Sequence, residues 1–198
     1  MDYHNLINKN VIKIIESLKK DRLYFNQIHE ATGIKSKNSL VKELNKLTQS
    51  KILIREKNKS NTFYSINLKN RFSLALLEVI NSGRFQTLPF ERREAINEVI
   101  EITKPMLAIL FGSTAKGSYG KESDMDLLLI YNGDYKRVYN PERVDEISAR
   151  YGLKIKPIIM RASELKMHDS TIKHIFETGY PLTGHIYFYG FMESFYNV

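Results

Sequence analysis

Residues 106–130 read MLAILFGSTAKGSYGKESDMDLLLI, and this stretch decides the fold. An apolar run ends at Gly112-Ser113, ten residues follow, and a second apolar run opens with Asp124-Met125-Asp126. Short apolar runs bounded by glycine, serine and charged residues are typical of buried strands. The stretch therefore predicts a strand, a Gly-Ser turn, a short helix and a second strand.

The second predicted strand opens with two aspartates, Asp124 and Asp126. Alternation along a strand places both side chains on one face, about 7 Å apart, so that both carboxylates can converge on a divalent cation. The small residues Gly112 and Ser113 let the backbone approach a phosphate, and amides at the start of the next helix suit an anion. A metal site beside a phosphate cradle predicts phosphoryl or nucleotidyl transfer, in which two cations roughly 3.5 to 4 Å apart can stabilise the attacking and leaving oxygens.

This segment resembles the signature of the DNA polymerase beta-type nucleotidyltransferase superfamily, which is Gly-Ser, ten residues and Asp-x-Asp. The resemblance covers about residues 89–185 and extends to Lys116-Gly117 and Ser123, as in the small stand-alone members. It implies Mg²⁺ and a nucleoside triphosphate, with ATP expected, as ligands. The nucleotide-binding residues that it implies are Gly112, Ser113, Lys116 and Ser123. The implied metal ligands, which are also the catalytic residues, are Asp124 and Asp126.

The sequence departs from this superfamily in one respect. Active members usually carry a third carboxylate on the next strand, where it can bind a metal and act as a base. The candidate strand, residues 153–160, contains no acid, and its polar positions are Lys154 and Lys156. A lysine facing the aspartates would change the local formal charge from about −3 to about −1 and weaken cation binding. The alternative is that both lysines face solvent. The acids nearby in sequence are Asp145, Glu146 and Glu164.

The net charge of +8 is confined to the first third of the chain. Residues 1–70 hold 14 Lys and Arg against 6 Asp and Glu, whereas residues 71–198 hold 16 of each. A localised excess of positive charge indicates a surface for a partner. The chain therefore combines a basic module with an electrically balanced one.

Helical spacing and turn residues predict three helices and a hairpin in the basic module. The first helix is expected over about residues 6–20, with its ends at Leu6 and Lys20, and the second over 26–32, with Asn26 as its N-cap. The third helix is expected to start after Ser36 as its cap. Two strands, at about 52–54 and 63–66, follow around a polar turn that carries two lysines.

This arrangement resembles the winged helix-turn-helix of bacterial and archaeal transcription regulators over residues 6–68. In that family the third helix enters the DNA major groove, and the wing contacts the backbone or minor groove. The DNA-binding residues that the resemblance implies are Lys37, Asn38, Ser39, Lys42, Lys46, Lys57 and Lys59. The alternative is a solvated helix face on a module used for protein contact or dimerisation.

The expected fold class is α+β. Residues 1–70 are expected to form a winged helix-turn-helix, 71–88 a helical connector, and 89–198 a nucleotidyltransferase-like domain with a mixed β-sheet. The absence of cysteine excludes disulfides, cysteine-ligated zinc fingers and thiol catalysis. No uncharged stretch reaches the ~18 apolar residues of a membrane span, and residues 1–4 lack the basic start of a signal peptide. The expected location is the cytoplasm, with no membrane as a partner.

Three functions are compatible with these patterns. The leading prediction is a magnesium-dependent nucleotidyltransferase that the winged helix brings to DNA, and that moves a nucleoside monophosphate from a triphosphate to a hydroxyl of a nucleic acid or protein. The second is a DNA-binding regulator whose transferase domain has lost turnover, which the missing acid favours. The third, by resemblance to antitoxins of this superfamily, is control of a toxin. A homodimer is favoured because winged-helix regulators often pair on two half-sites.

Overall fold

The computed structural model describes residues 7–19, 21–166 and 169–196. The chain divides into two compact units, Met1–Ile80 and Asn81–Val198. Helix α4 (Arg71–Gln86) runs through the point of division. The domain boundaries expected at residues 70 and 88 stay a prediction.

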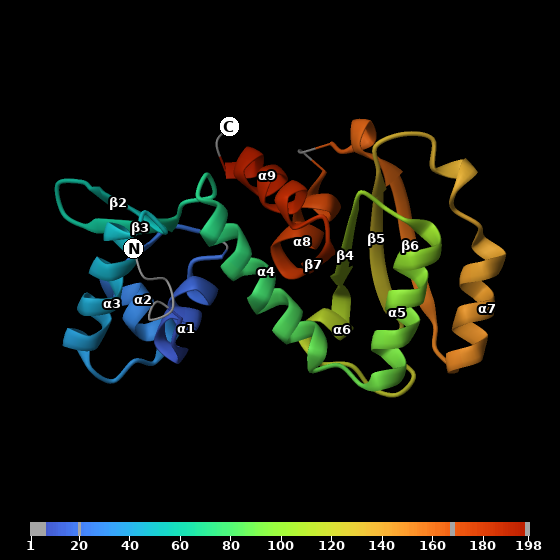
Figure 1. Cartoon of the computed structure of the whole chain (residues 1–198), viewed down its shortest axis with the longest axis horizontal. Coiled ribbons are helices and arrows are strands. Elements are labelled where there is room, and N and C mark those ends of the chain that lie inside the picture. The colour runs from blue at the N-terminus through green and yellow to red at the C-terminus, as the bar shows by residue number, and fades with distance from the viewer. Residues whose placement is uncertain (1–6, 20, 167–168, 197–198) are drawn as a thin grey trace. The chain divides into compact units, whose positions relative to one another are not determined.

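Three helices fill the first unit, and Figure 1 shows them in blue. They are α1 (Lys9–Ser17), α2 (Phe25–Thr32) and α3 (Lys37–Gln49). The hydroxyl of Ser36 accepts a hydrogen bond from the Ser39 amide at 3.2 Å and caps α3, as predicted. The predicted ends of the first helix, Leu6 and Lys20, lie outside the described residues. The helices bury an apolar core whose members are at most 1% exposed: Val11, Ile14, Ile15, Ile28, Leu40, Leu44 and Leu47.

A three-stranded antiparallel sheet in the order β1-β3-β2 completes this unit. Its strands are β1 (Leu23–Tyr24), β2 (Leu53–Lys57) and β3 (Thr62–Ile66). The two-residue β1 was not predicted because it is too short to show a periodic pattern. Pairing with β3 keeps the chain extended as far as Tyr24, which is therefore the N-cap of α2, and the prediction of Asn26 as this cap is wrong. The Gln27 side chain accepts the Tyr24 amide at 3.1 Å.

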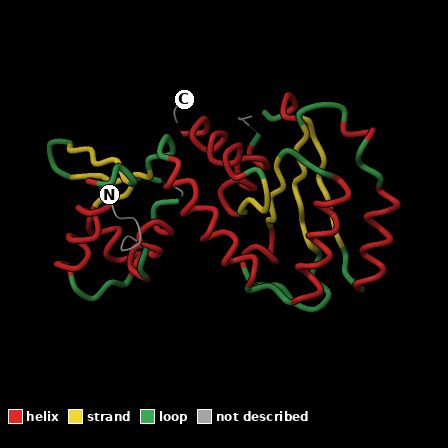
Figure 2. The backbone as a smooth tube through the Cα atoms, in the orientation of Figure 1, coloured by secondary structure: helices red, strands yellow, loops and turns green. Residues whose placement is uncertain are grey.

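Four strands form a mixed sheet in the second unit, in the order β6-β5-β4-β7 (Figure 2). They are β4 (Leu107–Phe111), β5 (Met125–Tyr131), β6 (Ile155–Arg161) and β7 (Tyr180–Thr183). Strand β4 is antiparallel to β5 and β7, and β5 is parallel to β6. The short helix α6 (Gly112–Lys116) follows β4 directly. The predicted order of strand, turn, short helix and strand is therefore confirmed, as is the mixed sheet.

Helices cover both faces of this sheet (Figure 1). One face packs against α5 (Phe90–Thr103) and α7 (Pro141–Tyr151). The other packs against α8 (Ser170–Thr178) and α9 (His185–Tyr196). Met125, Leu127 and Leu129 of β5 belong to the core shared with α5 and α7 and are fully buried. Burial of both faces explains why β4 and β5 read as nearly continuous apolar runs.

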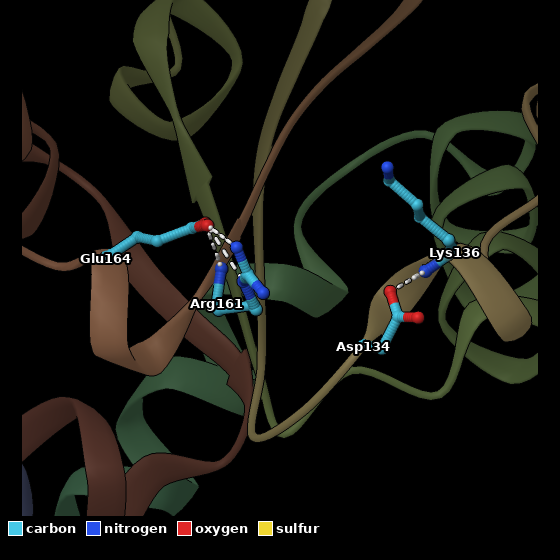
Figure 3. A network of polar contacts seen from close by, with 4 residues as sticks. All are labelled: Asp134, Lys136, Arg161 and Glu164. Carbon is cyan, nitrogen blue, oxygen red and sulfur yellow. Dashed lines mark hydrogen bonds and ion pairs between the residues drawn. The ribbon is translucent and has the colours of Figure 1, made fainter.

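Two short 3₁₀ helices follow the C-terminal ends of β5 and β6. They are η1 (Tyr135–Arg137) and η2 (Ala162–Glu164), respectively. Figure 3 shows the polar contacts that order them. The carboxylate of Asp134 accepts the Lys136 amide at 3.2 Å. Glu164 accepts the Arg161 backbone amide at 2.8 Å and pairs with the Arg161 guanidinium at 2.6 Å.

Within the described part of the chain, no helix combines the length and apolarity that crossing a membrane requires.

Candidate active site

The carboxylate of Asp126 lies against Gly112, where β4 ends and β5 begins. Phe111, the last residue of β4, pairs with Asp126 in the antiparallel register. Gly112 has φ +72°, and a Cβ atom there would lie 3.2 Å from Cγ of Asp126 and closer still to its Oδ2. Only glycine tolerates both this left-handed backbone and so close a carboxylate. The Gly-Ser turn is therefore shaped to leave room for the second aspartate.

Asp124 directly precedes β5 and forms an ion pair with Lys156. The ammonium Nζ lies 2.5 Å from Oδ2 of Asp124, and the side chains of Lys156 and Asp124 are 64% and 30% exposed, respectively. Lys156 stands opposite Asp126 in the parallel register of β5 and β6. The sequence left open whether a lysine of this strand faces the aspartates or both face solvent. The structure shows that Lys156 faces the aspartates. Lys154 precedes β6 and is exposed.

These three charged groups shift one another's pKa. The hydrogen bond with Lys156 is the main cause that lowers the pKa of Asp124. Burial raises the pKa of Asp126, and the negative charge of Asp124 adds to the rise. The hydrogen bond with Asp124 raises the pKa of Lys156, so its ammonium stays protonated at neutral pH. With all three groups ionised, the cluster carries two negative charges and one positive charge.

The oxygen atoms of this cluster fit one small divalent cation. Mg²⁺ is usually bound by one or two carboxylates together with substrate phosphates and water. Two carboxylates are present, those of Asp124 and Asp126, and the second of them fills the position that a Cβ of Gly112 would take. Among the residues that the structure describes, no group of three or more His, Cys, Asp or Glu is arranged to hold a metal. Asp124 and Asp126 are the residues that would hold a cation here.

The three acids considered as replacements for the missing carboxylate lie elsewhere. Asp145 and Glu146 are exposed on α7. Glu164 is engaged by Arg161, which aligns with Tyr131, five residues along β5 from Asp126. At about 3.3 Å per residue, this places Arg161 about 16 Å along the strand from the aspartates.

The other expected nucleotide-binding residues lie on α6 and on the loop that follows it. Ser113 is half-buried beside Gly112, and Lys116 is exposed at the end of the helix. The Ser123 hydroxyl accepts the Gly120 amide at 2.8 Å and so orders the turn just before Asp124. The Gly-Ser turn therefore adjoins the aspartates, and Ser123 shapes the approach to them.

A buried arginine, which sequence reasoning missed, holds this loop in place. Arg92 on α5 is only 4% exposed. Its guanidinium donates to the Thr114 hydroxyl at 3.2 Å and to the carbonyls of Gly120 and Ser123 at 3.1 Å each. The Thr114 hydroxyl donates in turn to the carbonyl of Asp124 at 3.1 Å. Arg92 thus connects α5 to both ends of the loop between Thr114 and Ser123, which leads directly into Asp124.

The sequence did contain a signal for this arginine. Arg92 is followed at helical spacing by Ala95, Ile96 and Val99, all fully buried, so it lies on the apolar stripe of α5. Its guanidinium also lies 4.6 Å from the ring centroid of Tyr119. Burying a positive charge is costly unless its hydrogen bonds are satisfied, so the loop carbonyls and the guanidinium depend on one another.

The residues expected to contact DNA differ in their exposure. Lys37, Asn38 and Lys42 are exposed on the first turns of α3. Lys57 and Lys59 are exposed at the end of β2 and in the turn after it. The two half-buried members are Ser39, whose hydroxyl accepts a hydrogen bond from Asn10 at 3.4 Å, and Lys46. A basic surface is therefore available on α3 and the hairpin.

Comparison with known proteins identifies a nucleotidyltransferase domain within the second unit. A family model described as a nucleotidyltransferase domain matches residues 92–180. A relative from Methanocaldococcus jannaschii, named as a protein adenylyltransferase, is 35% identical over 75 residues, which cover 35% of this chain and 75% of the relative. No solved structure gives a significant match.

Proposed function

This chain belongs to the nucleotidyltransferase domain family, and from that premise we propose that it moves a nucleoside monophosphate from a nucleoside triphosphate, with ATP the expected donor, to an acceptor hydroxyl. The observation that carries the proposal is that Asp126 lies against the Cβ-free position of Gly112, while Lys156, which stands opposite Asp126, contacts Asp124. A protein is the favoured acceptor because the M. jannaschii relative is named as a protein adenylyltransferase.

Asp124 and Asp126 are the proposed ligands of Mg²⁺, which supplies Lewis-acid stabilisation of the charge that develops on the transferred phosphoryl group. Gly112 and Ser113 are proposed to bind the triphosphate through the backbone, since neither has a large side chain. Lys116 and Ser123 are proposed to contact the nucleotide from the two ends of the intervening loop.

The acceptor oxygen forms a bond to the α-phosphorus, and pyrophosphate leaves with the electrons of the broken P–O bond. We assign the proton of the acceptor hydroxyl to water. Lys156, the residue of β6 that faces the aspartates, carries a proton already because its hydrogen bond with Asp124 raises its pKa. A protonated amine cannot act as a general base.

The experiment that tests the proposal is label transfer from each α-labelled nucleoside triphosphate in the presence of Mg²⁺ and cell lysate. We expect the full chain to label an acceptor and the double variant Asp124→Ala/Asp126→Ala to label none. Asp145→Ala, which removes an exposed acid of α7 outside the cluster, is the matched control and is expected to retain transfer. Equal labelling by wild type and double variant would contradict the proposal, as would no labelling by either.

For the first unit we propose nucleic-acid binding in the manner of a winged helix-turn-helix. The excess of Lys and Arg over Asp and Glu in residues 1–70 and the exposure of Lys37 and Lys42 support it. Each lysine that no longer neutralises a phosphate reduces the slope of log K against log salt by about 0.9 on duplex DNA. The double variant Lys37→Ala/Lys42→Ala is therefore expected to reduce this slope by about 2 in an anisotropy titration of full-length protein. An unchanged slope would favour the protein-contact alternative.

The regulator without turnover is the second candidate function, and the Lys156–Asp124 ion pair favours it. It requires DNA binding that Asp124→Ala leaves unchanged, together with no label transfer by the wild type. Control of a toxin and pairing of two chains on DNA stay proposals, which co-purification with neighbouring gene products and analytical ultracentrifugation with DNA would test.

A further inference from the structure

We propose that the ammonium of Lys156 replaces one of the two divalent cations of a two-metal transfer site, so that this chain takes a single divalent cation per bound nucleotide. The inference rests on the proposed function, because it assigns a cation to the same site. It goes beyond that function by stating how many metal ions the reaction uses, and which side chain stands in for the other.

The position of Lys156 supports this replacement. Its ammonium contacts Oδ2 of Asp124 at 2.5 Å, and its backbone lies opposite Asp126 on the neighbouring strand. Lys156 therefore lies beside both aspartates. A second cation that shared these two carboxylates as ligands would need the space that the ammonium takes. Two metal ions in such sites lie about 3.5 to 4 Å apart, a span that a lysine side chain covers easily.

The formal charge of the site leads to the same conclusion. A site with three carboxylates and two divalent cations carries a formal charge of about +1. Two carboxylates, one ammonium and one divalent cation give about the same value, and a second divalent cation would raise it to about +3 in a confined space. Losing an acid and gaining a lysine therefore preserves the charge that the triphosphate meets only if one metal ion is also lost.

The exposure of Lys156 allows it to act on the nucleotide. Its side chain is 64% exposed, so it can turn away from Asp124 without leaving a buried cavity. A lysine ammonium is a compact charge on a flexible stem and a common phosphate ligand. We assign its charge to the triphosphate, beside the single cation that the aspartates hold.

The test counts bound metal ions on the full-length protein. Mn²⁺ is titrated by electron paramagnetic resonance in the presence of a triphosphate analogue with a non-hydrolysable α,β bridge. The wild type is expected to bind one Mn²⁺ per chain without spin coupling. Lys156→Asp supplies a third carboxylate and is expected to bind two, with the broadened spectrum of a coupled pair. Lys69→Asp makes the same charge change at an exposed position of the first unit, which contributes no residue to the cluster, and is expected to stay at one.

A second variant keeps the proposal testable if Lys156→Asp fails to fold. In Lys156→Met the competing ammonium is gone, so the single Mn²⁺ is expected to bind about 30-fold more tightly, the factor for a unit charge at about 4 Å from a divalent cation in water. Lys154→Met is the matched control, and its effect is expected to be smaller. Two coupled Mn²⁺ ions on the wild type would overturn this inference and leave the transfer reaction intact. Failure of the wild type to bind either Mn²⁺ or the analogue would overturn the proposed function as well.

Discussion

The two ends of strand β6 each carry an ion pair, yet the pairs are built differently. At one end Arg161 pairs with Glu164 three residues later, and Glu164 also accepts the Arg161 amide. At the other end Lys156 pairs with Asp124, a residue that lies 32 positions earlier and precedes a different strand. The first pair orders a short turn, whereas the second brings a positive charge into a candidate metal site.

The surroundings of the two pairs extend this contrast. Asp124 is held through its carbonyl by Thr114, which Arg92 contacts from α5. Asp126 has its place because Gly112 lacks a Cβ. The Arg161–Glu164 pair needs no such long-range support. Chemistry is therefore expected only at the end of the strand pair where distant segments converge, and four predictions test this difference.

The largest effect is expected from Asp126→Asn. The amide keeps the shape of the side chain and removes the negative charge that binds the cation, so label transfer should fall by about 10³-fold. Thermal stability should not decrease, because burial disfavours the charged form of Asp126. Glu164→Gln makes the same chemical change at the other end of β6 and should leave transfer unaltered. A loss below tenfold in Asp126→Asn would count against the assignment of this ligand.

Gly112→Ala is expected to have the next largest effect. The new methyl group would collide with the Asp126 carboxylate at a residue with φ +72°, which costs about 1–3 kcal/mol of stability. Displacement of the carboxylate should lower transfer by about 10²-fold. The control is Gly133→Ala, where a Cβ would meet nothing within 4 Å. Transfer rates and urea unfolding midpoints measured on both variants check the prediction, and similar losses in the two would refute it.

Arg92→Met should have an intermediate effect through the loop before Asp124. Loss of the guanidinium leaves the part-buried carbonyls of Gly120 and Ser123 without this donor, at a total cost of about 1–3 kcal/mol because water can partly replace it. Transfer should fall about tenfold as the aspartate loses its fixed position. Amide hydrogen exchange over residues 117–124 should accelerate. The neighbouring Arg93, which donates to Gln86, provides the control Arg93→Met.

The smallest effect is expected in the acid titration of two carboxyl groups, one at each end of β6. They are Asp126, which stands opposite Lys156, and Glu164, which pairs with Arg161. The pKa of Asp126 is raised above 3.8, so its contribution favours the folded state below that pH and is lost as pH rises through the folded pKa. The pKa of Glu164 is lowered below 4.5 by hydrogen bonds with Arg161, so its contribution is present above pH 4.5 and is lost as pH falls. Carbon-13 titration of the carboxyl groups checks both directions, and a midpoint below 3.8 for Asp126 or above 4.5 for Glu164 would contradict them.

The local pattern of the sequence was sufficient to predict most secondary structure. The helix that begins after Ser36 and the strand that ends at Gly112 follow from periodicity and turn residues, which depend on neighbours in the chain. The strand β1 was missed and the cap of α2 was misplaced because both depend on pairing between Tyr24 and Phe63, 39 positions apart.

The candidate site was predictable only in part for the same reason. The spacing of Gly112, Asp124 and Asp126 indicated the proposed ligands, because alternation along a strand is a local property. Which lysine faces them depends on the register of β6 against β5, and that register sets Lys156 beside Asp126. The buried Arg92 could be suspected from its place on an apolar stripe, but not its partners.

Residue types and their spacing were thus enough to determine the two strands around Gly112-Ser113, the turn and the two acids, since these follow from backbone geometry over a few residues. The packing of distant segments decided which charges meet, because a salt bridge or a buried hydrogen bond forms only where the folded chain brings both partners within about 3 Å. Lys156 on Asp124 and Arg92 on the loop carbonyls belong to this second class.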